Sequence, residues 1–166
     1  INGGLTKGTE NLSVNPQNEK SLIETLKCAV ICSTATISTF KQPKNRNRGN
    51  LTGKGEWQVT GDPTEIALLI AGAKAGITKE SLETSFRKLD EYPFDSETRF
   101  MAVHCVTGSE KRIYFKGAEE VILPRCTQYM DEKGNINTLT PKIRRKLSEK
   151  VIEMSNKALR VLALAY

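Results

Sequence analysis

Five side chains of this sequence could together bind an adenine nucleotide. They are one carboxylate, one aromatic ring and three cations: Glu65, Phe94, Arg99, Lys116 and Arg160. A carboxylate accepts hydrogen bonds from an amino group, an aromatic face stacks on a flat base, and cations pair with phosphates. Because an adenine nucleotide offers an amino group, a purine face and a negatively charged tail, the set complements that class of ligand.

Glu65 admits two interpretations, both set by the stretch GDPTEIALLIAGAKAG at 61–76. Asp62 suits a helix N-cap, Pro63 suits the first helical position, and Glu65 then stands at the capping-box position. Alternatively, a glutamate in the first turn projects from the rim of a sheet toward a ligand. Glu65→Gln separates the two, since Gln also serves in a capping box and a pure cap would leave nucleotide affinity unchanged.

Phe94 stands in YPFDSETRFM, residues 92–101, where a strand gives way to a polar turn. Its ring is either plain core or a stacking platform at the rim of a sheet. Arg99 follows five residues later and places a cation beside that platform. Since a purine nucleotide needs both groups, this stretch is a candidate base site.

The two remaining cations stand at the ends of predicted elements. In YFKGAEE, Lys116 ends a strand and Gly117 opens a helix, where a small residue lets a ligand approach the backbone. Arg160 is the only charge in ALRVLALAY, and a buried strand tolerates arginine where its head reaches solvent or an anion. A surface lysine and an exposed edge arginine are the structural alternatives.

The elements that position these residues follow from hydrophobic periodicity. After an irregular lead-in over 1–18, the pattern predicts a mixture of helices and strands joined by short turns. Such a succession favours an α+β fold, a twisted antiparallel sheet flanked by helices. The predicted helices are 21–34, 62–74, a short one from Thr78 to Phe86, 117–123 and 140–157, and the predicted strands are 57–59, 88–94, 99–106, 111–116 and 159–166.

Length and composition describe one ordinary globular domain over 1–166, with 38% hydrophobic and 27% charged residues. No apolar run approaches the ~20 residues that cross a bilayer, and the N-terminus lacks a secretory signal pattern. The cysteines lack metal-ligand spacing, so we expect buried reduced thiols and no metal site. They are Cys28, Cys32, Cys105 and Cys126.

The net charge of +6 is concentrated in 41–55, which carry five basic and no acidic residues. Such a run could bind nucleic acid or an anionic membrane. It lacks aromatic residues for base stacking, however, and its Pro, Asn and Gly content is typical of a solvated, flexible loop. A nucleic-acid-binding module, or an interaction domain without a ligand, therefore remains as the alternative class of protein.

Four sequence segments resemble, in order, the nucleotide-binding domain of P-type cation-transporting ATPases, and among these the type II, calcium-pump-like members. The segments are GDPTE at 61–65, PFDSETRFM at 93–101, FKGAEEVI at 115–122 and ALRVLALAY at 158–166. The resemblance implies a twisted antiparallel sheet flanked by helices and a domain that binds ATP. It also implies a place at the cytosolic face of a membrane, in an enzyme that pumps a cation, with calcium as the first candidate and sodium next.

The resemblance also assigns roles to the matching residues. Phe94 would stack on adenine, and Glu65 would face its amino group. Lys116 and Gly117 would line the floor of the pocket, and Arg99 would stand beside the nucleotide, where the family usually has lysine. On the phosphate side the resemblance places Arg160, with Leu162 nearby.

Two departures and one missing motif qualify the match. Glu119 replaces the proline of the family's KGAPE sequence, and Arg99 keeps the charge of lysine with a different donor geometry. No DKTGT sequence occurs here, so no residue of this chain is expected to be the phosphorylated aspartate. We expect an excised domain that holds ATP, with Mg²⁺ accompanying the nucleotide in the full pump, and does not turn over alone.

The expected partners are ATP and the phosphorylation and actuator domains of the same polypeptide. We expect a monomer that makes no direct contact with the membrane or with nucleic acid.

Overall fold

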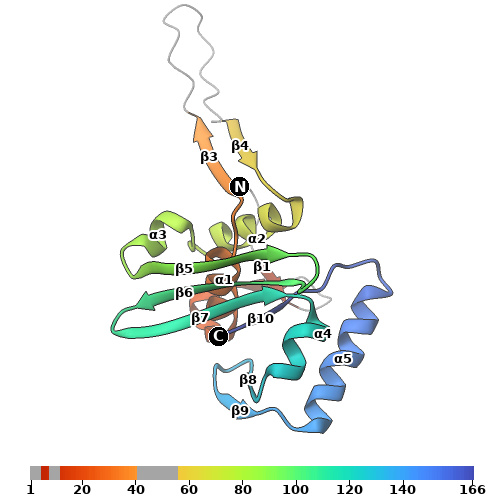
Figure 1. Ribbon diagram of the computed structural model, residues 1–166. Helices are drawn as coiled ribbons and strands as arrows, with labels where there is room; N and C mark the ends of the chain where they lie inside the picture. Colours follow the sequence, from red (N-terminus) through yellow and green to blue (C-terminus); the bar gives the residue numbers. More distant parts are fainter. Residues whose placement is uncertain (1–4, 8–11, 41–55) are drawn as a thin grey trace, which may run out of the picture.

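An antiparallel sheet of four strands organises the molecule (Figure 1). The computed structural model describes residues 5–7, 12–40 and 56–166. In the main sheet the strand order is β10-β7-β6-β5, and each neighbouring pair is antiparallel. Helices and antiparallel strands together confirm the predicted α+β class. The strand bounds are β5 (Phe86–Asp95), β6 (Phe100–Thr107), β7 (Glu110–Gly117) and β10 (Ala163–Ala165).

Alternation along β6 decides which face of the sheet is buried. Met101, Val103 and Cys105 are at most 1% exposed and form one hydrophobic cluster with Cys28 of α1 (Lys20–Ile31). Successive strand residues point to opposite faces, so the residues between these three face away from α1. Figure 1 shows α1 behind the sheet, which places the buried face on its side.

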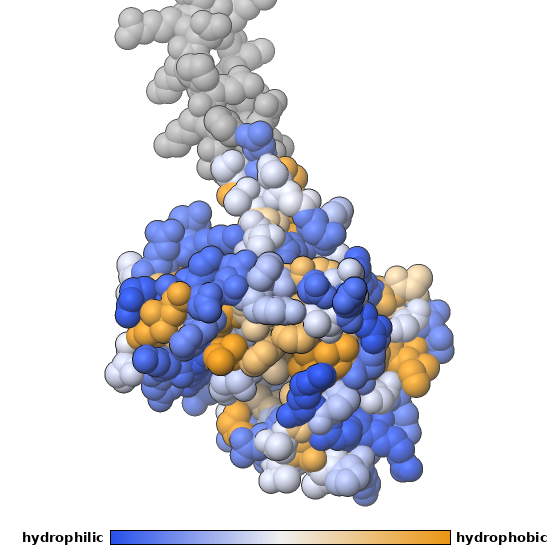
Figure 2. Space-filling view, in the orientation of Figure 1, coloured by the Kyte–Doolittle hydropathy of each residue, from blue (hydrophilic) through white to orange (hydrophobic). Residues whose placement is uncertain are grey.

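The opposite face of the sheet carries aromatic side chains that remain partly exposed. Tyr92 stacks on Phe100 with ring centroids 5.4 Å apart, and Phe100 lies 6.1 Å from Phe115. Figure 2 shows apolar residues, in orange, over the middle of this face, with hydrophilic residues around them.

Two further helices join α1 in a second hydrophobic cluster. α2 (Pro63–Lys74) packs its Leu69 against α1 in this cluster, as its apolar sequence predicts. α3 (Lys79–Glu83) begins at Thr78, which forms a capping box with Ser81. The sequence predicted this helix to continue to residue 86, but the chain leaves the helix at Glu83 and enters β5.

Three short strand pairs lie outside the main sheet. Residues 1–18 were expected to be irregular, yet they contain a strand pair and a 3-10 turn, η1 (Pro16–Asn18). A strand that the sequence analysis missed, β3, pairs with the predicted strand near Trp57. The basic segment 41–55 lies outside the described residues. The pairs are β1 (Leu5–Lys7) with β2 (Leu12–Val14), β3 (Thr36–Phe40) with β4 (Glu56–Thr60), and β8 (Gln128–Met130) with β9 (Ile136–Thr138).

The C-terminal part folds beside the sheet as a helical unit with one hairpin. α4 (Glu119–Ile122) runs into the 3-10 turn η2 (Leu123–Arg125), and α5 (Pro141–Ser155) is the long helix that the sequence predicted. The guanidinium of Arg144 donates to the backbone carbonyls of Leu123 and Cys126, which ties α5 to η2. Within the described ranges, no helix has the length and apolarity that a membrane span requires.

Candidate nucleotide-binding site

The start of α2 is capped by Asp62, as the sequence predicts. Its Oδ1 accepts hydrogen bonds from the backbone N–H groups of Thr64 and Glu65, at 2.8 and 3.3 Å. Hydrogen bonds from Thr64 lower the pKa of the Asp62 carboxyl, because they stabilise its charged form. The cap therefore needs nothing from the side chain of Glu65.

The side chain of Glu65 instead points into the protein, and donors fill the acceptor sites of one of its two carboxylate oxygens. Its Oε2 accepts from Thr34 N at 2.8 Å, from Thr34 Oγ1 at 2.9 Å and from Ala35 N at 2.9 Å. Its Oε1 accepts from Lys116 Nζ at 2.6 Å. Burial alone would raise the pKa of this carboxyl, but Lys116, Ala35 and Thr34 outweigh burial and hold the pKa below its ordinary value of 4.5. The carboxylate is therefore charged and fixed in place at neutral pH.

Lys116 is as buried as its partner. It is 5% exposed, and Glu65 is 9% exposed, so the two form an ion pair almost out of contact with solvent. The charge of Lys116 is thereby neutralised within the protein. Lys116 therefore lies beside the acceptor carboxylate. Of the three cations predicted for the site, Arg99 and Arg160 remain to meet phosphates.

Gly117 is explained by the packing of the backbone. A Cβ atom at this position would lie 2.5 Å from the carbonyl oxygen of Arg99 and 2.6 Å from the Cβ of Phe100. Phe100 pairs with Gly117 in the register of β6 and β7, and Gly117 pairs with Ala163 of β10. The glycine thus lets the turn before β6 lie directly on β7, which is a second reason for a small residue here.

Arg99 ends a tight turn that is built by Asp95. The Oδ1 of Asp95 accepts from the N–H groups of Glu97 and Thr98, each at 2.8 Å, and its carbonyl accepts from Arg99 N at 2.7 Å. Arg99 has a φ of 57°, in the left-handed region. Its Nη1 lies 2.7 Å from Oε1 of Glu120, and both side chains are exposed. The fold therefore presents the Arg99 guanidinium to solvent, beside a carboxylate.

Phe94 lies at an irregularity near the end of β5. The register with β6 shifts between Tyr92, which pairs with Ala102, and Asp95, which pairs with Phe100. Phe94 stands in this interval and is 59% exposed. It is therefore not a core residue, and its ring is open to a stacking partner.

Arg160 does not lie in a strand, which corrects the sequence prediction. The predicted strand over 159–166 shortens to β10, and Arg160 belongs to the segment between α5 and β10. Its side chain is exposed, and its Nη1 donates to Oγ1 of Thr64 at 3.0 Å. Arg160 therefore reaches the first turn of α2, next to Glu65 in the sequence.

Sheet register and hydrogen bonds bring most of the predicted site residues to one end of the sheet, on the right in Figure 1. There β5 ends, β6 begins, β7 ends and β10 begins, and α2 starts beside them. The chemistry is divided: a buried, charge-neutral carboxylate–ammonium pair lies in the interior, and an exposed ring and two guanidinium groups lie outside. That division suits a ligand with a polar flat base and an anionic tail.

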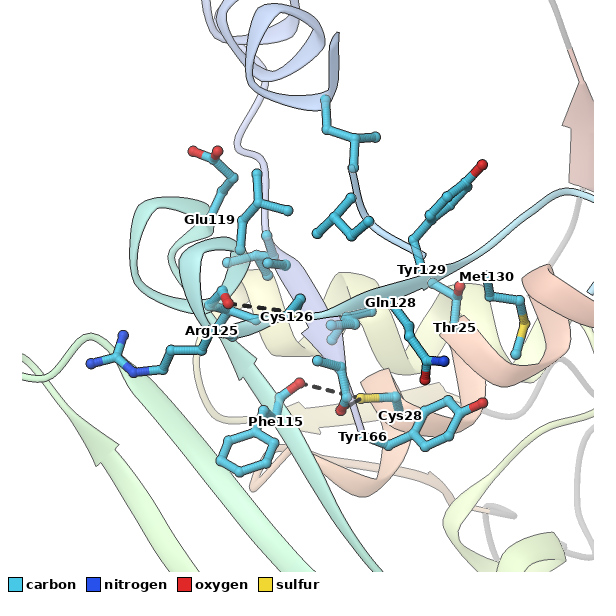
Figure 3. Close-up of a pocket in the computed structure, with 18 of the residues that line it drawn as sticks. Thr25, Cys28, Phe115, Glu119, Arg125, Cys126, Gln128, Tyr129, Met130 and Tyr166 are labelled. Carbon is cyan, nitrogen blue, oxygen red and sulfur yellow. Dashed lines mark hydrogen bonds between the residues drawn. The ribbon is translucent and has the colours of Figure 1, made fainter. Parts of the chain in front are cut away.

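Leu162 lines a large apolar cavity whose lining includes neither Glu65 nor Lys116. This cavity, of about 690 Å³, is bounded by α1, β7, β10 and the α4–α5 unit. Figure 3 shows Cys28 inside it, donating to the carbonyl of Phe115 at 3.4 Å. Of the seven residues predicted for the nucleotide, Leu162 is the one that lines this cavity.

Two contacts of the site were missed by the sequence analysis. Thr34 and Ala35 lie 31 and 30 residues from the glutamate that they bind, and two of their three donors are backbone N–H groups. Since every non-proline residue has such a group, no side-chain pattern reveals this contact. Glu120 was visible within FKGAEEVI, but its pairing with Arg99 depends on the register of β6 and β7.

Comparison with known proteins gives one family over most of the chain. The family described as P-type ATPase, cytoplasmic domain N, matches residues 21–166. Calcium-transporting ATPase 1 of Bacillus cereus is 34% identical over 157 residues, and its namesake in Lactococcus lactis is 33% identical over 162. The sodium/potassium exporting P-type ATPase cta3 of Schizosaccharomyces pombe is 35% identical over 162 residues.

These matches cover 95%, 97% and 96% of this chain but only 15%, 16% and 14% of the three relatives. The fold is an α+β domain with a candidate nucleotide site at the end of its sheet. The chain belongs to the P-type ATPase family, as its cytoplasmic N domain, and it resembles the calcium-transporting members.

Proposed function

We propose that this domain binds ATP at the end of the sheet where α2 starts. The observation that carries the proposal is the division of the site into a buried acceptor and an exposed cationic rim. Phe94 provides the stacking face, and Glu65 accepts from the adenine amino group through Oε1. Lys116 and Gly117 form the floor.

The phosphates extend toward the exposed guanidinium groups. Arg99 and Arg160 are both open to solvent. The guanidinium of Arg99 pairs with Glu120 and that of Arg160 donates to Thr64, and an anion can replace either contact. Arginine suits this role because its planar fork pairs with phosphate oxygens. Leu162 follows Arg160 by two residues and lines the neighbouring apolar cavity. Mg²⁺ would arrive with the nucleotide, on phosphate oxygens, so we assign no residue of this chain to it.

In the full pump, the domain would present the γ-phosphate to the aspartate of a separate phosphorylation domain. That aspartate attacks the phosphorus, the bond to the β-phosphate oxygen breaks, and ADP leaves. The actuator domain is the other partner within the polypeptide. The description of the matching family supports a place for this domain at the cytosolic face of a membrane. The names of the relatives support a cation pump, with calcium as its first candidate cation and sodium next.

The affinity of the isolated domain should be modest. A stacked base contributes about 1–3 kcal/mol, and an exposed charge pair adds roughly 0–1 kcal/mol. After the cost of association, the Kd for ATP is on the order of 0.1 to several mM.

Titration of the labelled domain with ATP, followed by NMR, tests this function. We expect the amide resonances around Phe94, Glu65 and Lys116 to shift, and Phe94→Ala to weaken binding at least about fivefold. Tyr92→Ala is the matched control, because Tyr92 is a half-exposed aromatic of the same strand that stacks on Phe100. Unmoved resonances around the three site residues, or equal losses in both variants, would contradict the proposal.

A further inference from the structure

The loop between α1 and β3 holds the carboxylate of Glu65 from one side. Both N–H groups of the Thr34–Ala35 pair and the Thr34 hydroxyl donate to the same oxygen, Oε2, at 2.8–2.9 Å. The contacts join segments about 30 residues apart in the sequence. This loop belongs to none of the four segments that resemble P-type pumps.

The loop is itself anchored at several points. Lys79 of α3 donates to the carbonyl of Ala35 at 2.8 Å, and the hydroxyl of Ser33 donates to the carbonyl of Ala29 at 2.7 Å. Gly61 presses against Ala35 so closely that an added Cβ would lie 2.6 Å from the Ala35 Cβ. Ala35 is 1% exposed. The donors that meet Glu65 therefore have little freedom to move.

Hydrogen-bond capacity shows what the loop does to the glutamate. An ionised carboxylate has about four lone-pair sites, two on each oxygen. Among the residues that the structure describes, Oε2 receives three donors and is saturated, whereas Oε1 receives one donor, the ammonium of Lys116. One acceptor site remains, on Oε1, and its direction is set by the three donors on the other oxygen. A carboxylate free to rotate would offer either oxygen to water or to a cation.

We propose that Thr34, together with the Ala35 backbone, is a positioning residue that aims the remaining acceptor site of Glu65 and thereby sets a preference for purines with an amino group at C6. The inference rests on the proposed nucleotide function and adds to it the determinant of base selectivity. A 6-amino purine donates a hydrogen to Oε1. A 6-oxo purine presents an oxygen there, which a fixed carboxylate repels.

The test compares ATP with ITP, which carry an amino group and an oxygen, respectively, at C6 of the base. Both nucleotides are titrated by NMR against wild type, Thr34→Val and Thr34→Ser. Valine keeps the shape of threonine and removes the hydroxyl, while serine retains the hydroxyl. Thr36→Val is the matched control, since Thr36 is an exposed threonine two residues along the chain. We expect wild type to bind ATP about tenfold more tightly than ITP, because unmatched buried polar groups are penalised.

In Thr34→Val, the ATP affinity should fall about three- to tenfold while the ITP affinity stays within about twofold, so that the ratio collapses. Thr34→Ser should restore the ratio, and Thr36→Val should not change it. A general loss of structure would weaken both nucleotides alike, so it would not imitate this result. If Thr34→Val fails to fold, Thr34→Ala removes the same hydroxyl, and the ratio of ATP to ITP affinity in that variant decides instead.

The outcomes separate this inference from the function on which it rests. If wild type does not bind ATP, the proposed function fails and the inference with it. If wild type prefers ATP to ITP and Thr34→Val keeps the same ratio, only the positioning role of Thr34 is overturned. A ratio that collapses in Thr36→Val as far as in Thr34→Val would overturn it as well.

Discussion

Replacing Glu65 by glutamine tests whether the buried ion pair is the electrostatic centre of the site. Glutamine has the size of glutamate but one acceptor oxygen and one amide donor group. If its oxygen faces Thr34 and Ala35, its amide nitrogen meets the ammonium of Lys116, which lies 2.6 Å from the present Oε1. If the oxygen faces Lys116, the amide nitrogen meets two backbone N–H groups. Neither orientation satisfies both sides.

The expected destabilisation follows from burial. The side chains of Lys116 and Glu65 are only 6% and 12% exposed, so the variant leaves a buried ammonium without its counter-charge. Breaking a buried pair in this way costs about 3–5 kcal/mol. Lys116→Met should cost less, about 2–3 kcal/mol, because the carboxylate keeps three other donors. The double variant removes both charges, so its cost should lie about 3 kcal/mol below the sum of the single costs.

Urea unfolding, followed by circular dichroism, measures these free energies. For Glu65→Gln the unfolding midpoint should fall by about 1.5–2.5 M, with a slope near 2 kcal/mol/M. Glu24→Gln is the matched control: Glu24 pairs with Lys27 at 2.7 Å on the surface of α1, and such a pair contributes about 0–1 kcal/mol. A Glu65→Gln variant as stable as Glu24→Gln, or additive single costs in the double variant, would refute the reasoning.

Four further outcomes are expected. Gly117→Ala should destabilise the fold by about 2 kcal/mol in urea unfolding, because its Cβ would overlap the Arg99 carbonyl. Arg99→Gly should be about 1 kcal/mol more stable than Arg99→Ala, since glycine accepts a φ of 57° without strain, and equal stability would contradict this. As pH falls below 4.5, wild type should lose the stability that the charged Glu65 contributes, because the native pKa is lowered, whereas Glu65→Gln should show a flatter profile. Glu120→Gln should bind ATP about two- to fivefold more tightly, by releasing Arg99, with adenosine unaffected and Glu119→Gln as control.

Local sequence rules predicted the elements whose causes are local. The helix start at Asp62 and Pro63 depends on capping within three residues, and the structure confirms it. The three successive strands β5, β6 and β7 depend on alternation and on a turn at Gly108, whose φ of 61° suits glycine. The missed strand β3 pairs across the interval 41–55 with β4, so its stabilisation comes from a partner far along the chain. Propensity alone carries no such information.

The candidate site shows the same distinction between features set by local sequence and features set by contacts with distant residues. Residue types and the order of the four segments were enough to single out the family and the candidate ligand class, because those depend on chemistry written in side chains. The structure decided how Glu65 is used: Lys116, 51 residues away, neutralises it, and the Thr34–Ala35 backbone orients it. It also decided that Arg160 lies outside the strand and reaches Thr64. These contacts arise where strand ends and a helix start meet, and only the packed sheet specifies which distant groups share that space.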